Sequence, residues 1–494
     1  MIKDVYRLAQ TGISLILIVF LCAPAAAEVT TLDLPDIGDS TGGLLSPEFE
    51  RRLGQAFLSR VRKQADLVAD PEVNTYIESI GYRLVSQSDN NEQQFTFFVI
   101  NDSLINAFAA PGGIIGINSG VILNADSESE LAGVMAHEVA HVTQKHMARS
   151  VEMSKKMSIP TLAAMLGAIL VATQNPEAGQ AALMAVQGVS AQAQINFTRT
   201  NEQEADRIGI QLLARSGFDP RGMTGFFRKL QQSSRFSAQA PEFLRTHPLT
   251  TRRIADASAR AAAYSGALEV EESMSFPLVK AKLIVSSHKA PGEAVEYFSR
   301  RLAGAGRGGA SEADRYGYII ALTAAGQYAL AREQARRLLS GDPENVAYLL
   351  AAADIEVRQG NYDAAFEIFS KTERLYPDYR PLVLNFANAL LKAGQPGLAR
   401  DKLREFGRFQ TPDITYFDYL TRAEAEAGDQ VESSIANAEY YFLTGETRVA
   451  IEQLRHLLRQ QAPRPDYYQS ERIRARMAFL EQELELERAM KLRK

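Results

Sequence analysis

Hydrophobic and small residues cover nearly the whole surface of one predicted helix, from about Ser129 to Arg149. The apolar side chains fill one broad arc of the helical wheel, and alanine and glycine fill much of the rest: Leu131, Val134, Met135, Val139 and Val142, with Ala132, Gly133, Ala136 and Ala140. A helix that is apolar nearly all round is expected to be buried. Any charged side chain within it therefore needs a partner, because burying an unpaired charge is costly.

The neighbouring pattern predicts further helices and a small sheet. Helical signals occupy residues 47–64 and 71–84, and the aromatic and β-branched run at 95–100 favours a strand. Residues 104–118, with a Pro-Gly-Gly turn at 111–113, predict a β-hairpin beside the buried helix. This hairpin is either an ordinary structural element or an edge to which an extended peptide can add as a strand.

Residues 158–194 are rich in alanine, leucine, methionine and glycine. Their apolar run at 162–172 is too short to cross a bilayer. A pair of core helices is the default interpretation of this segment. A mobile flap over an active site is the alternative.

A second pattern begins after about residue 270, where single positions repeat every 34 residues. The repeated positions are Gly326, Gly360, Gly394 and Gly428, and Pro343 and Pro377 share the interval. A 34-residue period is typical of tetratricopeptide repeats (TPRs), each of which is a pair of antiparallel helices. We predict a TPR-like solenoid over residues 276–470, closed by a charged helix at 471–494. Such a solenoid presents a concave surface to segments of other proteins.

The first residues have the pattern of a secretory signal peptide. A basic start precedes an apolar core at 13–21, and three alanines offer a cleavage site after Ala27. We predict a signal peptide at 1–27, followed by a flexible leader at 28–43. The alternatives are a lipoprotein acylated at Cys22 and an uncleaved membrane anchor.

Composition narrows the classes of function. The chain of 494 residues has a net charge of −5 and no basic block interleaved with aromatic residues, which argues against nucleic-acid binding. An acidic protein has no electrostatic reason to lie flat on anionic lipid, although peripheral membrane association stays open. Cys22 is the only cysteine and falls within the predicted signal peptide. The mature chain would therefore have no disulfide, catalytic thiol or cysteine-bound metal.

Candidate chemistry lies inside the buried helix, at His137-Glu138-x-x-His141. Residues four apart lie on one face of a helix, so the two imidazoles can bind one Zn²⁺. Glu138 can reach a water beside that ion and act as a general base. Two histidines at this spacing are often surface residues, but here their surroundings are apolar. We therefore predict a catalytic site with one zinc per chain.

A catalytic zinc usually has three protein ligands. The candidate for the third is Glu202, in Glu202-x-x-Ala205-Asp206 on a second predicted helix. Asp206 shares a face with Glu202 and can orient a ligand histidine through a hydrogen bond. An acidic helical turn on its own is more often a solvated face, so this assignment depends on the upstream motif.

Other histidines and arginines carry weaker signals. His146 points away from His137 on the helical wheel, which favours a surface or packing role. His288 and His456 are isolated and receive no function. One member of the pair Arg252 and Arg253 could help to neutralise an oxyanion, but a surface salt bridge is the favoured interpretation.

Together with His247-Pro248, these motifs resemble the Ste/Oma/HtpX-type gluzincin metallopeptidases over residues 44–262. Residues 106–113 are similar to that family's strand and turn beside the active site. The resemblance implies an α+β zinc metallopeptidase domain, mostly helical with a small sheet. It implies His137, His141 and Glu202 as zinc ligands and Glu138 as the base.

The same resemblance places His247 beside the zinc. On its own, a loop histidine is more often a structural hydrogen-bonding residue. Near the metal, His247 could replace water as a regulatory fourth ligand and hold the enzyme inactive until its loop moves. We expect a linker at 263–275 between this domain and the all-α solenoid.

The branch of the family that carries C-terminal repeats implies a cellular role. It implies periplasmic quality control of outer-membrane β-barrel proteins, with misfolded or stalled β-barrel proteins as substrates and the β-barrel assembly machinery as a partner. A chaperone-like role beside proteolysis is also implied. Two alternatives stay open, namely a TPR scaffold whose zinc site is silent or strongly autoinhibited, and a zinc amidase that acts on peptidoglycan.

Overall fold

The computed structural model describes residues 47–89, 93–153, 167, 191–236, 241–264, 273–304, 311–460, 462 and 464–489. These residues belong to one unit, Leu45–Lys494. The predicted signal peptide, the predicted leader and nearly all of the predicted flap lie outside them. None of the described helices combines the length and the apolar character needed to span a bilayer.

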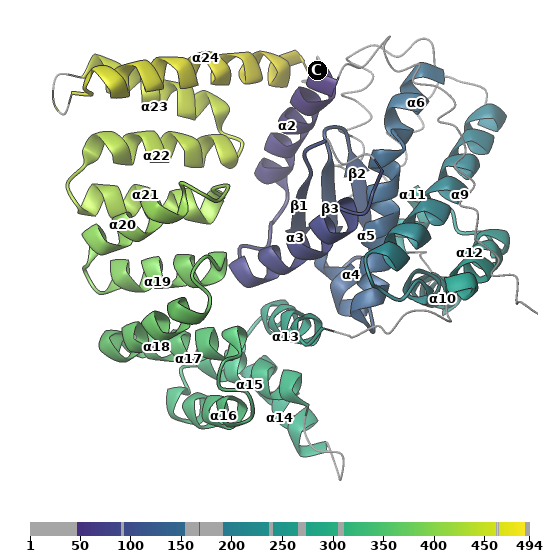
Figure 1. Cartoon of the computed structure of the whole chain (residues 1–494), viewed down its shortest axis with the longest axis horizontal. Coiled ribbons are helices and arrows are strands. Elements are labelled where there is room, and N and C mark those ends of the chain that lie inside the picture. The colour runs from purple at the N-terminus through teal and green to yellow at the C-terminus, as the bar shows by residue number, and fades with distance from the viewer. Residues whose placement is uncertain are drawn as a thin grey trace, which may run out of the picture. The chain divides into compact units, whose positions relative to one another are not determined.

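In the described part of the chain, three strands form a mixed sheet (Figure 1). The strands are β1 (Thr96–Ile100), β2 (Ala107–Ala110) and β3 (Ile114–Asn118), in the order β1-β3-β2. β1 pairs with β3 in parallel, and β2 pairs with β3 antiparallel. Gly112 and Gly113, both at φ 75°, form the turn between β2 and β3, which glycine permits because it has no Cβ. The predicted hairpin is confirmed, and β2 forms one edge of this sheet.

Helices pack on the sheet or on the helices that cover it. They are α2 (Pro47–Gln64), α3 (Pro71–Val85), α4 (Ser119–Asn124), α5 (Glu128–Thr143), α6 (His146–Met153), α9 (Ala191–Arg215), α10 (Arg221–Phe236), α11 (Glu242–Thr246) and α12 (Thr251–Tyr264). The core between them includes Val99 of β1, Ile117 of β3 and Phe226 of α10. The central helix, α5, contacts α3, α9, α10 and β2, so it is covered by other elements, as its apolar pattern predicts.

The end of α5 differs from the sequence prediction. The predicted helix from Ser129 to Arg149 is wrong as a single element, because α5 ends at Thr143 and α6 begins at His146. Between them Lys145 has φ 52°, in the left-handed region, and its N–H donates to Val142 O at 2.9 Å. A left-handed residue of this kind closes a helix and redirects the chain.

The helices after residue 273 form a consecutive array. They are α13 (Ser275–Ser287), α14 (Pro291–Gly304), α15 (Glu312–Ala324), α16 (Tyr328–Gly341), α17 (Val346–Gln359), α18 (Tyr362–Leu375), α19 (Arg380–Lys392), α20 (Pro396–Phe406), α21 (Ile414–Glu426), α22 (Gln430–Leu443), α23 (Thr447–Arg459) and α24 (Tyr467–Ala489). Consecutive helices contact one another along the array.

The 34-residue period marks the turns within these helix pairs. Gly326, Gly360, Gly394 and Gly428 have φ values of 73°, 85°, 71° and 90°, and each lies between two paired helices. Left-handed glycine ends a helix without a steric penalty, so the glycine pattern predicts where each pair turns. Five residues after three of these glycines, Ala331, Ala365 and Ala399 are completely buried. The paired helices at this period are confirmed.

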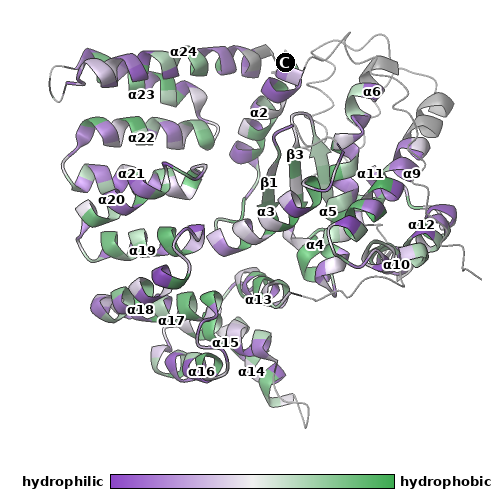
Figure 2. Ribbon diagram, in the orientation of Figure 1, coloured by the Kyte–Doolittle hydropathy of each residue, from purple (hydrophilic) through white to green (hydrophobic). Residues whose placement is uncertain are grey.

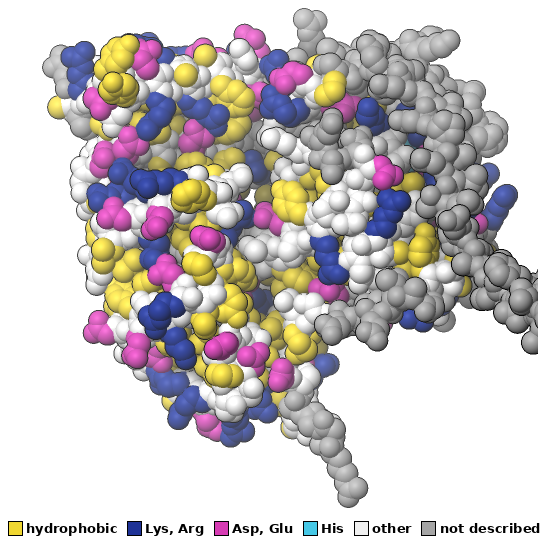
Figure 3. Space-filling view, in the orientation of Figure 1, with side chains coloured by type: hydrophobic (Ala, Val, Ile, Leu, Met, Phe, Trp, Pro, Cys, Tyr) yellow, Lys and Arg dark blue, Asp and Glu magenta, His cyan; other side chains and the backbone are white. Residues whose placement is uncertain are grey.

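The array is amphipathic rather than apolar. Figure 2 shows hydrophobic and hydrophilic residues alternating along helices such as α20 and α22. The apolar sides pack on one another, as Phe369 of α18 packs on Phe386 of α19 with ring centroids 5.0 Å apart. On the face drawn in Figure 3, basic and acidic side chains are interspersed over the array. Interspersed charge of both signs is typical of a solvated surface.

Candidate metal centre

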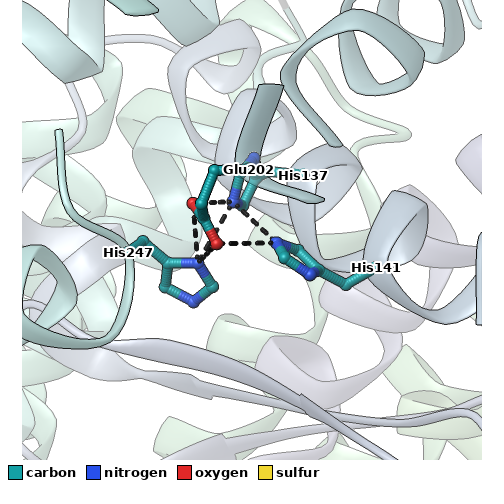
Figure 4. A group of neighbouring side chains, drawn as sticks. All are labelled: His137, His141, Glu202 and His247. Carbon is teal, nitrogen blue, oxygen red and sulfur yellow. Dashed lines mark hydrogen bonds and ion pairs between the residues drawn. The ribbon is translucent and has the colours of Figure 1, made fainter. Parts of the chain in front are cut away.

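Two histidines of α5 face the same side of the helix, one turn apart (Figure 4). His137 is completely buried, and its Nε2 lies 3.1 Å from Nε2 of His141. At the start of α5, the Ser127 hydroxyl accepts a hydrogen bond from the Glu130 N–H, and the Glu130 carboxylate accepts one from the Asp126 N–H. This cap fixes where the helix begins, and the four-residue spacing then fixes the two imidazoles relative to each other.

Glycines allow α9 and α10 to approach α5 closely. A Cβ atom at Gly133 of α5 would lie 2.7 Å from the Cα atom of Met223 in α10. A Cβ atom at Gly209 of α9 would lie 3.2 Å from the backbone of Ala136 in α5. Larger residues would push these helices apart. The close crossing therefore brings the side chains of α9 within reach of the α5 imidazoles.

Glu202 and Asp206 of α9 face the two histidines, and both carboxylates are buried. Glu202 Oε2 lies 3.4 Å from His137 Nε2, and Glu202 Oε1 lies 3.4 Å from His141 Nε2. Asp206 Oδ1 lies 3.2 Å from the other ring nitrogen of His137, Nδ1. The two acidic residues singled out in the sequence thus reach opposite sides of the His137 ring.

His247, which follows α11, completes the group (Figure 4). Its Nδ1 lies 3.0 Å from Glu202 Oε1 and 3.2 Å from His137 Nε2. His137, His141, Glu202 and His247 each offer one ligand atom, and these atoms lie within 4.8 Å of one another. The structure therefore brings together all four residues that the sequence singled out around a zinc.

Most of the contacts among these residues are close to the spacing of a tetrahedral zinc site. Zinc bonds of about 2.0–2.1 Å to nitrogen and oxygen, arranged as a tetrahedron, place neighbouring ligand atoms about 3.3–3.4 Å apart. The contacts among these residues run from 3.0 Å to 3.4 Å when either oxygen of Glu202 is counted, and all four ligand atoms lie within 4.8 Å of one another. Imidazole nitrogens with one carboxylate are also a donor set that suits Zn²⁺. The residues present therefore fit this metal.

Burial and neighbouring charges shift the pKa values of the site. Burial opposes protonation of His137, but Asp206 and Glu202 raise its pKa to about 9. Burial lowers the pKa of His141 to about 3. Burial acts against ionisation of Glu202 as well, but His247, His137 and His141 hold its pKa well below the ordinary value. A metal that binds neutral imidazoles would therefore displace a proton from His137.

Glu138 lies beside this group and is almost completely buried. Within the described residues no side chain donates a hydrogen bond to its carboxylate, and His247 Nε2 lies 3.5 Å from Oε1. Burial raises the pKa of Glu138 above its ordinary value. A buried carboxylate with a raised pKa, next to a candidate metal site, is well suited to accept a proton from water.

The structure places Arg253 differently from the surface position expected from the sequence. Its side chain is only 3% exposed, so the expected surface salt bridge is wrong for this residue. Its Nε and Nη2 donate to the Asp206 carboxylate at 2.7 Å and 2.8 Å, and its Nη1 lies 2.7 Å from Glu202 Oε2. The signal that could have identified it is its position in α12, where Arg253, Ala257 and Ala261 form the buried face at four-residue spacing.

The structure also places His146 differently from its expected direction, which is away from His137. Of the two expected roles, surface and packing, burial excludes the first, and the expected direction away from the zinc histidines is wrong, because its Nδ1 lies 3.0 Å from Nδ1 of His141. Its Nε2 lies 3.1 Å from Glu204 Oε2. The helical wheel assumed one continuous helix through residue 149, whereas the left-handed Lys145 turns His146 back toward His141. No glycine or proline marks this turn in the sequence.

Comparisons with known proteins agree with this geometry. Residues 71–261 match the family described as Peptidase family M48. The chain is 38% identical over 429 residues to the Beta-barrel assembly-enhancing protease of Escherichia coli (strain K12), covering 87% of each chain. It is 36% identical over 431 residues to the Putative beta-barrel assembly-enhancing protease of Vibrio cholerae, covering 87% of this chain and 89% of the relative.

A more distant relative matches a smaller part of the chain. The chain is 26% identical over 219 residues to the Mitochondrial metalloendopeptidase OMA1 of Schizosaccharomyces pombe, covering 42% of this chain and 60% of the relative. The M48 match includes every residue of the convergent His and Glu group. Because the first two relatives match along most of both chains, this chain belongs to peptidase family M48 and is a zinc-dependent metalloendopeptidase.

Proposed function

We propose that this endopeptidase acts in the periplasm on outer-membrane β-barrel proteins that misfold or stall during assembly. The observation that carries the proposal is the convergence of His137, His141 and Glu202 beside the buried Glu138. Support for the substrate class comes from the two relatives named as beta-barrel assembly-enhancing proteases, which match over most of this chain.

In this proposal His137, His141 and Glu202 hold the zinc, and Asp206 supports His137 through Nδ1. Bound zinc supplies Lewis acidity, which polarises the carbonyl of the scissile peptide bond and makes water more acidic. Glu138 takes a proton from the attacking water and later gives it to the nitrogen of the leaving amine. The carboxylate of Glu138 is available for this transfer, because no side chain of the described residues forms a hydrogen bond with it, and the Ala109 backbone favours its ionised form.

His247 controls access to the centre in this proposal. Its Nδ1 contacts Glu202 and its Nε2 lies 3.5 Å from the Glu138 carboxylate, so it lies between a candidate ligand and the candidate base, where it can compete with water for the metal. We expect His247 to act as a fourth ligand in a resting state, which ends when the turn after α11 moves. His247→Ala should then cleave at least one substrate faster than the wild type. No gain on any folded or misfolded substrate would reject this role.

The edge strand β2 is the expected place for an extended substrate. It lies at one edge of the sheet and contacts α5, which carries His137 and Glu138. A peptide can add to such an edge through main-chain hydrogen bonds, which straightens it for cleavage and requires little of its sequence. This mode suits an enzyme that removes unassembled β-strand proteins.

The remaining parts of the chain have supporting roles. We assign residues 1–27 to a signal peptide, 28–43 to a leader and 44–262 to the peptidase domain. A linker at 263–275 leads to a TPR-like solenoid at 276–470 and a C-terminal helix at 471–494. The solenoid offers a binding surface for substrate segments or for the β-barrel assembly machinery, and a chaperone-like activity follows from such binding.

The test measures the cleavage of three substrates by the purified wild-type chain and by the Glu138→Gln variant. The substrates are an outer-membrane β-barrel protein kept unfolded, the same protein folded, and an unrelated unfolded protein of similar length. We expect the wild type to cleave the unfolded β-barrel protein in preference to both others, and Glu138→Gln to cleave none. Equal cleavage of both unfolded proteins would reject the substrate class. Normal barrel assembly in cells that carry only Glu138→Gln would favour a binding scaffold instead.

A further inference from the structure

A left-handed residue turns the chain back onto the metal centre. Lys145 has φ 52° and is the one non-glycine residue with a positive φ in the described part of the chain. Lysine rarely adopts this conformation, because its Cβ approaches the following carbonyl. Such strain persists only where the surrounding structure holds it, and it gathers at functional sites. Its effect here is to bring His146 against the ring of His141.

His146 makes polar contacts with both of its ring nitrogens. Nδ1 lies 3.0 Å from Nδ1 of His141, and Nε2 lies 3.1 Å from Glu204 Oε2. Glu204 also accepts a hydrogen bond from Arg149 Nη1 at 2.9 Å. Because His146 is only 3% exposed, water does not compete strongly for these contacts. A row of side chains from α6 and α9 therefore ends on the ring of His141.

When Nε2 of His141 is a metal ligand, the neutral rings of His141 and His146 can place their protons in only one way. A ligating Nε2 carries no proton, so the neutral ring carries its proton on Nδ1. This Nδ1–H can donate only to an unprotonated Nδ1 of His146. The neutral ring of His146 then carries its proton on Nε2 and donates it to Glu204. Every donor in the row has an acceptor.

We propose that His146 is a positioning residue of the metal centre, which fixes the tautomer and the orientation of His141, and that Glu204 fixes His146 in turn. This inference rests on the proposed role of His141 as a ligand. It also gives the two imidazoles of α5 equivalent support from α9. Asp206 reaches Nδ1 of His137 directly, at 3.2 Å, whereas Glu204 reaches Nδ1 of His141 through His146.

A buried histidine could instead serve only to fill space, and two substitutions separate these roles. Asparagine offers an acceptor oxygen and a donor N–H, and its oxygen can take the place of Nδ1 as the acceptor for His141. Phenylalanine fills the volume of the ring but offers neither group, so His146→Phe preserves packing alone. His456→Ala, on the exposed side of α23, is the control for a histidine far from the centre in sequence.

The experiment measures zinc affinity of the full purified chain by competition with a chromophoric chelator. We expect His146→Phe to bind zinc about 10- to 100-fold more weakly, which is the usual effect of losing a partner of a metal-ligating histidine. His146→Asn should regain most of that affinity, and His456→Ala should match the wild type. The visible spectrum of the Co²⁺-substituted protein gives a second readout, since a tilted His141 ring changes the absorption bands in His146→Phe but not in His456→Ala.

Wild-type zinc affinity in His146→Phe would overturn the proposal, and so would equal losses in His146→Asn and His146→Phe. Should His146→Phe fail to fold, Glu204→Met removes the acceptor of His146 and should weaken zinc binding in the same direction; unchanged affinity there would also overturn it. His141→Ala separates this inference from the proposed function. Full zinc affinity in His141→Ala would reject the ligand assignment, whereas loss there with full affinity in His146→Phe would reject only the role of His146.

Discussion

Arg253 and Asp206 form a two-point ion pair beside the metal centre. The guanidinium donates through Nε and Nη2 to the two carboxylate oxygens at 2.7 Å and 2.8 Å. Asp206 contacts His137, and Arg253 Nη1 also donates to Pro248 O at 2.9 Å, next to His247. One buried cation therefore connects the acidic face of α9 with the turn that carries His247.

Arg253→Ala should destabilise the protein strongly. It leaves the Asp206 and Glu202 carboxylates buried without their cation, and breaking a buried pair from one side costs about 3–5 kcal/mol. Arg253→Lys should recover only part of this loss, because an ammonium group does not form two parallel hydrogen bonds with a carboxylate. Urea denaturation of the metal-free variants measures the free energy of unfolding.

The control lies on the same helix. Arg260 pairs with Asp256 four residues away, and both side chains are exposed. Arg260→Ala should change the free energy of unfolding by less than about 1 kcal/mol. Similar effects of Arg253→Ala and Arg260→Ala would show that Arg253 does not support the centre as described.

Gly133→Ala should destabilise the contact between α5 and α10. The added Cβ would lie 2.7 Å from Met223 Cα, and overpacking of this kind usually costs about 1–3 kcal/mol. Gly292 in α14 has no atom within 4 Å of its added Cβ, so Gly292→Ala should be neutral or slightly stabilising. Thermal unfolding of both variants tests this contrast. Equal melting temperatures would mean that α5 and α10 do not cross so closely.

Lys282 should prove important for joining α13 to α3. Its Nζ lies 2.8 Å from Asp70 Oδ2 and 2.6 Å from Glu72 Oε1, while Tyr316 Oη donates to Glu72 Oε2 at 3.2 Å. Burial already raises the pKa of Glu72, so removing the ammonium leaves a carboxylate in an unfavourable place. Lys282→Met should therefore lower the free energy of unfolding by about 3–5 kcal/mol.

A second substitution tests the cause of that loss. Adding Glu72→Gln to Lys282→Met removes the unpaired charge, so the double variant should be more stable than Lys282→Met alone. Chemical denaturation of the two variants and the wild type gives the comparison. A double variant less stable than the single one would indicate that packing, not charge, is responsible.

Glu242 should make stability depend on pH near neutrality. Burial raises its pKa from 4.5 to about 7, so the folded protein holds this proton more tightly than the unfolded chain does. Stabilisation from this group is complete below pH 4.5 and is lost as the pH rises through about 7. Glu242→Gln stays neutral, so its melting temperature should fall less than that of the wild type between about pH 5 and about pH 8. Parallel pH profiles would contradict this, and the exposed Glu293→Gln is the control.

The metal-centre residues could be predicted because most of them lie in regular helices. The spacing of residues along a helix determines the direction in which their side chains point. His137 and His141 of α5 therefore share a face, and so do Glu202 and Asp206 of α9. Four-residue spacing cannot show that two distant helices cross closely. The crossing of α5 and α9 depends on Gly209, which carries no signal of its partner in the sequence.

His146 and Arg253 could not be placed for different reasons. The helical pattern of the sequence continues through Lys145, and no residue type there signals a left-handed backbone. The helical wheel therefore predicts the wrong direction for the His146 side chain. Arg253 is charged, and charged residues are almost never fully buried unless they are paired. Its partner Asp206 is distant in sequence, and only the buried alanines Ala257 and Ala261 hinted at the buried side of α12.

Glu138→Gln tests the proposed mechanism most directly, through the rate of peptide hydrolysis at matched zinc content. Glutamine keeps the size of the side chain but cannot accept the proton. We expect the variant to bind zinc as the wild type does and to hydrolyse its substrate about 100- to 10,000-fold more slowly. Hydrolysis at the wild-type rate by zinc-loaded Glu138→Gln would contradict the assignment of proton transfer to this residue.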